Sequence, residues 1–187
     1  MSTLLSSIVE HNQHFVDSKE YEPFLTNRFP DKKMVIVTCM DARLTELLPK
    51  AMDLRNGDAK IIKNAGAVVS HQFGSVMRSI IVAVYELGAE EVFVVGHYDC
   101  GMTGLNPSSV LDKAESRGVS KDTISTLRNA GINLDNFLTG FDYVHDAVVN
   151  SVNLIRKHPL LPKSLIVHGL IINPETGRLD VIDCGDE

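Results

Sequence analysis

One apolar run constrains the fold of this chain more than any other feature. Residues 35–39 read Val-Ile-Val-Thr-Cys, and Asp41 and Arg43 follow at alternate positions. A run of β-branched residues without polar alternation is typical of a strand that is buried on both faces, as in a parallel sheet. Open α/β sheets bind their ligands at the carboxyl ends of such strands. The polar residues after this run are therefore the first candidates for a functional site.

A second stretch has the same design. Residues 91–95 read Glu-Val-Phe-Val-Val, again mostly apolar, and are followed by Gly-His-Tyr-Asp-Cys-Gly. If the two strands are neighbours, Cys39, His97 and Cys100 meet at one edge of the sheet. Two thiolates and one imidazole suit Zn²⁺, and three protein ligands leave a fourth position for water or substrate. The alternative is that both cysteines are small buried hydrophobic residues and that His97 is a satisfied loop residue.

The remaining patterns predict one α/β domain at 1–187, with an N-terminal arm and connector at 1–30 and an α/β core at 31–187. Strand–helix–strand alternation predicts a mainly parallel central sheet of about four strands, flanked by helices. A turn at 173–177 brings the last strand back as an antiparallel edge. Residues 102–136 are weakly patterned and predict at most one or two short helices. Helices are expected at 2–19, 44–52, 70–87 and 137–157, and strands at 35–39, 60–63, 91–95, 165–172 and 179–182.

Composition excludes several classes of function. The formal net charge of −6 and the lack of a basic cluster argue against nucleic-acid binding. The most apolar segment, 76–96, is interrupted by charged residues, so no membrane span is predicted. The N-terminus lacks the basic region of a signal peptide. Three cysteines in such a chain favour reduced thiols, and a cytoplasmic location is expected.

The pair formed by Asp41 and Arg43 permits two interpretations. In extended geometry the two side chains share one side and can form a bidentate salt bridge. A structural ion pair at a strand end is the simpler interpretation. Beside a metal ion, Asp41 could instead accept a hydrogen bond from metal-bound water, or ligate the metal if Arg43 released it.

Together these motifs resemble the signature of the β-class carbonic anhydrases. The segments that carry the resemblance are 39–43 and 96–101. Lys-Asn-Ala-Gly at 63–66 is similar to the Arg-Asn-Ala-Gly of that family. Residues 167–169 and 176–179 are similar to its closing strands, so the resemblance runs from about 34 to 179.

The resemblance implies one zinc ion per chain, bound by Cys39, His97 and Cys100. Asp41 and Arg43 would keep the fourth zinc position open for water. The implied activity is reversible hydration of CO₂ to bicarbonate and a proton by attack of zinc-bound hydroxide. The family also implies a homodimer or a dimer of dimers, with the N-terminal helix embracing the partner subunit. Because two thiolates cancel the charge of the ion, activity is expected to increase toward alkaline pH.

Two other functions would use the same residues. One is hydrolysis of a CO₂-like heterocumulene, such as carbonyl sulfide or carbon disulfide. The other is non-catalytic zinc binding, in which Asp41 or Cys184 permanently fills the fourth position. Cys184 lies in a polar tail and is expected to be a spectator.

Three further residues have weaker functional interpretations. His71 is a candidate proton shuttle, although a surface histidine at a helix start is the simpler interpretation. Asp99 could accept a hydrogen bond from His97 or be a solvated loop acid. The helix face that carries Phe73 and Met77 is expected to be core. Many relatives carry a Gln before a Pro ahead of the first strand, whereas this chain has Arg-Phe-Pro at 28–30, so no substrate hydrogen-bond donor is assigned.

Overall fold

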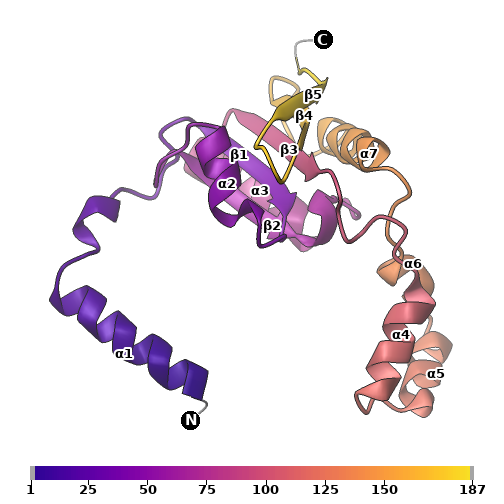
Figure 1. The fold of residues 1–187 in the computed structure, drawn as a ribbon. Helices are drawn as coiled ribbons and strands as arrows, with labels where there is room; N and C mark the ends of the chain where they lie inside the picture. Colours follow the sequence, from indigo (N-terminus) through magenta and orange to yellow (C-terminus); the bar gives the residue numbers. More distant parts are fainter. Residues whose placement is uncertain (1–2, 186–187) are drawn as a thin grey trace.

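A five-stranded sheet forms the centre of the protein (Figure 1). The structure is a computed structural model that describes residues 3–185. The strand order is β2-β1-β3-β4-β5, in which the first four strands are parallel and β5 runs antiparallel to β4. This confirms the predicted mainly parallel sheet with an antiparallel edge. The strands are β1 (Met34–Cys39), β2 (Ala59–Asn64), β3 (Glu91–His97), β4 (Ile166–Ile172) and β5 (Leu179–Asp183).

Strand β1 lies between β2 and β3, and all six of its residues are buried. Burial on both faces explains why this segment is continuously apolar rather than alternating. Its buried hydroxyl, on Thr38, donates to the carbonyl oxygen of Val95 on β3 at 3.0 Å. Because β1 and β3 are adjacent and parallel, with Thr38 opposite Val95, their carboxyl ends lie side by side.

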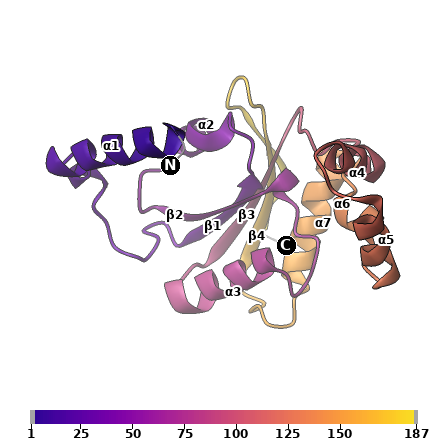
Figure 2. The ribbon, with the colours of Figure 1, turned by 90° about the horizontal axis from the view of Figure 1, so that it is seen from below.

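Helices cover both faces of the sheet (Figure 2). Helix α2 (Leu44–Ala51) packs on one face, together with Ile36 and both Cys39 and Cys100. Helices α3 (Ser75–Leu87) and α7 (Val144–Arg156) pack on the other face, where Val35 and Val37 point. The two candidate sulfur ligands, Cys39 and Cys100, therefore lie on the face of the sheet that α2 covers. Among residues 3–185, the structure contains no helix with the length and apolar character needed to cross a bilayer.

The N-terminal helix α1 (Thr3–Asp17) stands apart from the sheet (Figure 1). None of its described residues is buried, and Leu4 and Ile8 are 70% and 56% exposed. A short helix, Glu22–Phe24, follows in the connector. The structure thus confirms the predicted N-terminal helix, although residue 2, its predicted start, lies outside the described residues.

The region after β3 differs from the prediction. Residues 102–136 hold more helix than expected: α4 (Pro107–Ser116), α5 (Lys121–Asn129) and the start of α6 (Leu134–Leu138). The three helices form a lobe beside the sheet (Figures 1 and 2). Side chains of Asn106, Ser120 and Asn133 cap their N-termini. The sequence marks these helices by their N-terminal capping residues and not by a strong apolar stripe. A prediction from hydrophobic periodicity therefore misses part of them.

The long helix predicted at 137–157 is also wrong at its start, because α7 begins at Val144. Between α6 and α7 the chain pairs with the segment after Cys100: Gly140 N–H donates to the carbonyl oxygen of Leu105, and Phe141 N–H to that of Met102. A side chain at Gly140 would collide with the backbone of Met102. This close crossing interrupts the helical pattern and closes the base of the lobe.

The helix predicted at 70–87 begins later, at Ser75. Phe73 therefore precedes the helix and is 69% exposed, so its assignment to the core is wrong. Its ring instead packs edge-on against His158, with centroids 5.4 Å apart. Met77, in the first turn of the helix, is fully buried as expected, and Gly88 ends the helix in a left-handed conformation with φ 71°.

Gly96 lets α7 approach the end of β3 next to His97. A Cβ atom at this position would lie 2.8 Å from Val144 and 2.9 Å from Val148. We expect Gly96→Ala to lower the free energy of unfolding by about 1–3 kcal/mol, because overpacking forces side chains or backbone to move. Urea unfolding measures this change. Gly101→Ala is the matched control, since a Cβ atom there meets nothing within 4 Å; equal destabilisation by both would contradict the explanation.

Candidate metal centre

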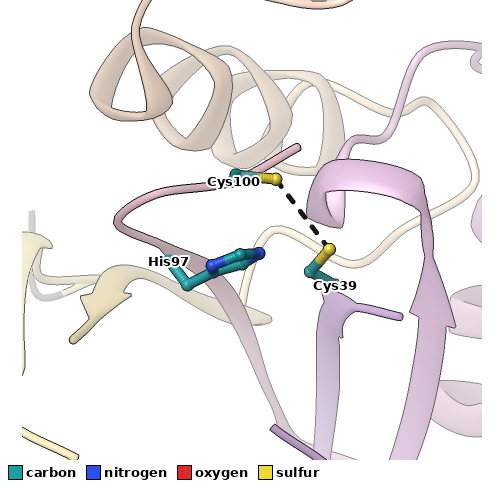
Figure 3. Close-up of side chains that lie close together, drawn as sticks. All are labelled: Cys39, His97 and Cys100. Atoms are coloured by element: carbon teal, nitrogen blue, oxygen red, sulfur yellow. Dashed lines mark hydrogen bonds between the residues drawn. The ribbon is translucent and has the colours of Figure 1, made fainter. Parts of the chain in front are cut away.

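Three ligating side chains meet at the carboxyl edge of the sheet (Figure 3). Cys39 ends β1, His97 ends β3, and Cys100 lies in the loop after β3. Their ligand atoms all lie within 4.8 Å of one another, and the two Sγ atoms are 3.9 Å apart. All three residues are buried, His97 to 1% exposure. Neither cysteine is in a disulfide.

The imidazole of His97 has one satisfied nitrogen and one unsatisfied nitrogen. Its Nδ1 lies 2.8 Å from the carbonyl oxygen of Tyr98. A carbonyl oxygen only accepts hydrogen bonds, so Nδ1 carries the proton and Nε2 presents a lone pair. In the described structure, Nε2 is buried without a hydrogen-bond partner. An unsatisfied buried nitrogen costs free energy, and a metal ion would satisfy it.

The two cysteines have different environments. Burial raises the pKa of Cys39, but the His97 ring in its protonated form and backbone N–H groups, including that of Gly66 at 3.4 Å from Sγ, bring it down to about 7. Burial raises the pKa of Cys100 to about 11. Cys39 is thus the sulfur that the protein itself prepares as a thiolate, whereas Cys100 depends on a cation to stabilise its thiolate form.

Gly66 presents its N–H to Cys39 from a left-handed conformation, with φ 81°. A Cβ atom at this position would lie 2.9 Å from the Phe141 ring and 3.1 Å from Met102. Met102 and Phe141 pack against the core cluster that contains both cysteines. Geometry therefore requires glycine at the end of the Lys-Asn-Ala-Gly segment. Its left-handed backbone directs the N–H at the sulfur of Cys39, and a side chain there would collide with Phe141 and Met102.

Asp41 and Arg43 form the bidentate pair that the sequence permits. Arg43 Nη2 donates to Asp41 Oδ2 at 2.8 Å, and Arg43 Nε donates to Oδ1 at 3.1 Å. The backbone N–H of Arg43 also donates to Oδ1, at 2.9 Å. The hydrogen bonds from Arg43 lower the pKa of Asp41 to about 2. Oδ2 lies 3.8 Å from His97 Nε2, so an ionised carboxylate borders the cluster.

Comparisons with known proteins agree with this geometry. Residues 34–179 match the family model described as carbonic anhydrase. Over 183 residues the chain is 64% identical to "Putative carbonic anhydrase YvdA" of Bacillus subtilis (strain 168), covering 98% of this chain and 93% of that protein. The crystal structure of β-carbonic anhydrase isoform I from Trichomonas vaginalis superposes with a TM-score of 0.88 at 34% identity, covering 99% of this chain and 100% of the other.

The chain belongs to the β-class carbonic anhydrase family. The match covers β1 through the first residue of β5, which includes all three ligand candidates and the Asp41–Arg43 pair. The family also has more distant relatives with another named activity. A carbon disulfide hydrolase of Acidithiobacillus thiooxidans is 27% identical, covering 96% of this chain and 86% of that protein.

Asp99 pairs with Arg43 rather than with His97. Its Oδ2 accepts from Arg43 Nη1 at 3.0 Å, and its backbone carbonyl accepts from Nη2 at 3.1 Å. The acceptor for His97 is the carbonyl of Tyr98, so the interpretation of Asp99 as that acceptor is wrong. Arg43 thereby ties the loop after β1 to the loop after β3. The sequence carries no signal for this pairing, because Asp99 comes within reach of Arg43 only after the two strands associate.

The other candidates lie outside the cluster. His71 is exposed in the turn before α3, where its Nδ1 accepts the backbone N–H of Phe73 at 3.0 Å. Cys184 is exposed and is not a member of the Cys39–His97–Cys100 group.

Proposed function

We propose that this chain is a zinc-dependent carbonic anhydrase that converts CO₂ and water reversibly to bicarbonate and a proton. The observation that carries the proposal is the buried Nε2 of His97, which has no hydrogen-bond partner among residues 3–185 and lies near two cysteine sulfurs and an ionised aspartate. Membership of the β-class family supports it. A purely structural cluster would not require a nitrogen lone pair in such a place.

Cys39, His97 and Cys100 would hold one zinc ion per chain. Two thiolates bound to zinc at about 2.3 Å in tetrahedral geometry lie roughly 3.8 Å apart. The two Sγ atoms are 3.9 Å apart, so the separation of the two sulfurs matches that of a tetrahedral zinc site. Zinc bound there supplies Lewis acidity, which makes water a nucleophile near neutral pH. Three protein ligands leave the fourth position for that water.

Asp41 and Arg43 would control the fourth position. An ionised carboxylate is only an acceptor, so Asp41 would accept a hydrogen bond from the reacting water and orient its lone pair toward CO₂. Arg43 occupies both carboxylate oxygens and so would keep Asp41 from ligating the metal itself. Asp99 would hold Arg43 from the opposite side.

Stopped-flow CO₂ hydration on zinc-quantified protein tests the proposal. Two thiolates neutralise zinc more than three imidazoles do, so the pKa of the water should lie between about 7 and about 9. The deprotonated form is the active one, so turnover should be roughly tenfold higher near pH 9 than near pH 7. About one zinc per chain with no turnover at either pH would refute the carbonic anhydrase activity, and a flat profile would refute the assigned acidity.

Hydrolysis of carbon disulfide or carbonyl sulfide is the second candidate. Its support is the set of relatives named carbon disulfide hydrolase, such as the one 27% identical to this chain. Sulfide release from carbon disulfide, assayed on the same protein, separates the two functions. Release of sulfide without CO₂ hydration would favour the second candidate.

Non-catalytic zinc binding is disfavoured by the contacts of the two residues that could close the site. Asp41 is held by Arg43, and Cys184 is exposed outside the cluster. An anion titration of cobalt-substituted protein tests this point. A change in the visible spectrum indicates an exchangeable fourth position, whereas an unchanged spectrum indicates a closed coordination shell.

We further propose a homodimer, or a dimer of dimers, in the cytoplasm. The exposed apolar face of α1 supports association, since a helix with this much apolar exposure is usually covered. The thiolates that zinc requires favour a reducing compartment. Light scattering after size exclusion measures the mass, and a monomer at micromolar concentration would contradict the assembly.

A further inference from the structure

The residue that follows His97 is tied across two strands. The backbone N–H of Tyr98 donates to the carbonyl oxygen of Ile172, the last residue of β4, at 3.1 Å. Its phenol hydroxyl donates to Asp180 Oδ2 on β5 at 2.9 Å. Since the strand order is β3-β4-β5, the side chain passes over the end of β4, and the pair bridges two strand spacings, or about 10 Å.

The same residue provides the acceptor for His97. The carbonyl oxygen of Tyr98 lies 2.8 Å from His97 Nδ1, so the direction of this peptide sets the tautomer and the plane of the imidazole. We propose that Tyr98 is a positioning residue for the metal ligand His97, with Asp180 as its anchor. The inference rests on the proposed function, because it assumes that His97 binds zinc.

Asp180 is itself held in place. Arg178 Nε donates to its Oδ1 at 3.1 Å, which leaves Oδ2 for the tyrosine hydroxyl. The antiparallel edge strand β5 contributes no metal ligand, but its Asp180 carboxylate contacts Tyr98, whose carbonyl oxygen contacts His97. Tyr98 is 40% exposed, so removal of its hydroxyl leaves the hydrophobic core unchanged. We therefore expect its loss to affect metal retention more than global stability.

Tyr98→Phe tests the anchor, because it keeps the ring and removes only the hydroxyl. Altered hydrogen-bond partners of metal ligands typically change metal affinity by about 10- to 100-fold. The Tyr98 hydroxyl does not contact His97 itself but holds the residue whose carbonyl does, so we expect an effect at the lower end of this range: extraction of zinc by a chelator should become roughly tenfold faster. Tyr85→Phe is the matched control: its hydroxyl donates to the carbonyl of Leu160 at 2.8 Å, away from the centre, and its loss should leave extraction unchanged.

Substitutions of the anchor distinguish positioning from general loosening. Asp180→Ala should accelerate extraction as Tyr98→Phe does, and the double variant should not exceed either single variant, because both remove the same bond. Asp180→Asn keeps an acceptor for the hydroxyl and should restore slow extraction in part. Arg178→Ala keeps the Tyr98–Asp180 bond and should have a smaller effect.

Two spectroscopic readouts complete the test. Cobalt-substituted Tyr98→Phe should show a shifted visible spectrum, because the ligand field senses imidazole orientation. In metal-free protein, ¹⁵N NMR should show a weakened preference for the Nδ1–H tautomer of His97. Unchanged extraction and an unchanged cobalt spectrum would overturn the inference. Wild-type protein that binds no zinc would instead refute the proposed function, so the two failures are distinguishable.

Discussion

Replacing Cys39 with serine is expected to abolish stoichiometric zinc binding and to reduce CO₂ hydration to the uncatalysed rate. Cys39 is the sulfur whose pKa the protein lowers to about 7, and it is buried with a backbone N–H directed at it. A serine hydroxyl does not ionise near neutral pH, and its oxygen reaches less far than sulfur. Since changes to the partners of ligands already cost about 10- to 100-fold, loss of a ligand should cost more than 100-fold in kcat/KM.

Metal analysis and stopped-flow kinetics on the same sample measure this result. Cys184→Ser is the matched control, because Cys184 is exposed and lies outside the cluster. It should keep about one zinc per chain and the activity of the unmodified protein. Circular dichroism verifies that Cys39→Ser remains folded. Full zinc content and activity in Cys39→Ser would show that the metal lies elsewhere.

Asp41→Asn should lower kcat/KM for CO₂ by roughly 100-fold or more while leaving zinc content unchanged. Removal of a group that orients or accepts a proton in the transition state typically costs about 10²- to 10⁴-fold. Asparagine removes the negative charge 3.8 Å from His97 Nε2 and the ion pair with Arg43. Stopped-flow kinetics with parallel zinc analysis separates lost catalysis from lost metal. An unchanged kcat/KM would mean that the Asp41–Arg43 pair is only a structural salt bridge and has no role in catalysis.

A graded comparison with Asp99 sharpens this prediction. The carboxylate of Asp99 is 84% exposed and contacts only the outer side of Arg43 in the described structure, so Asp99→Asn should change kcat/KM by a few-fold at most. Asp112→Asn, on α4, is the control for loss of a carboxylate far from the centre and should have no effect. Equal losses for Asp41→Asn and Asp99→Asn would mean that the position of Arg43, rather than the Asp41 carboxylate, limits the rate.

Local patterns in the sequence determined the parts of this protein nearest to the proposed chemistry. The continuous apolar run at 35–39 predicts a strand buried on both faces, and the structure places β1 between two neighbours. Because parallel strands end at the same edge, the sequence alone predicts that Cys39, His97 and Cys100 meet, and the structure brings them together. The burial pattern is a property of a short segment, and the alternation of strands and helices predicts parallel neighbours, so the sequence carries both signals.

Only the tertiary structure decided which residues surround the carboxyl edge of the sheet and what their side chains contact. The start of α7 at Val144 depends on a backbone crossing between Gly140 and Leu105, which leaves no trace in helical periodicity. The exposure of Phe73 depends on where α3 begins.

The hydrogen bonds from Arg43 to Asp99 and from Tyr98 to Asp180 join residues 56 and 82 positions apart. Such contacts exist only after the sheet has set the register of its strands. A residue's own neighbours in the chain decide whether it lies in a strand, whereas the relative placement of several strands decides what its side chain touches.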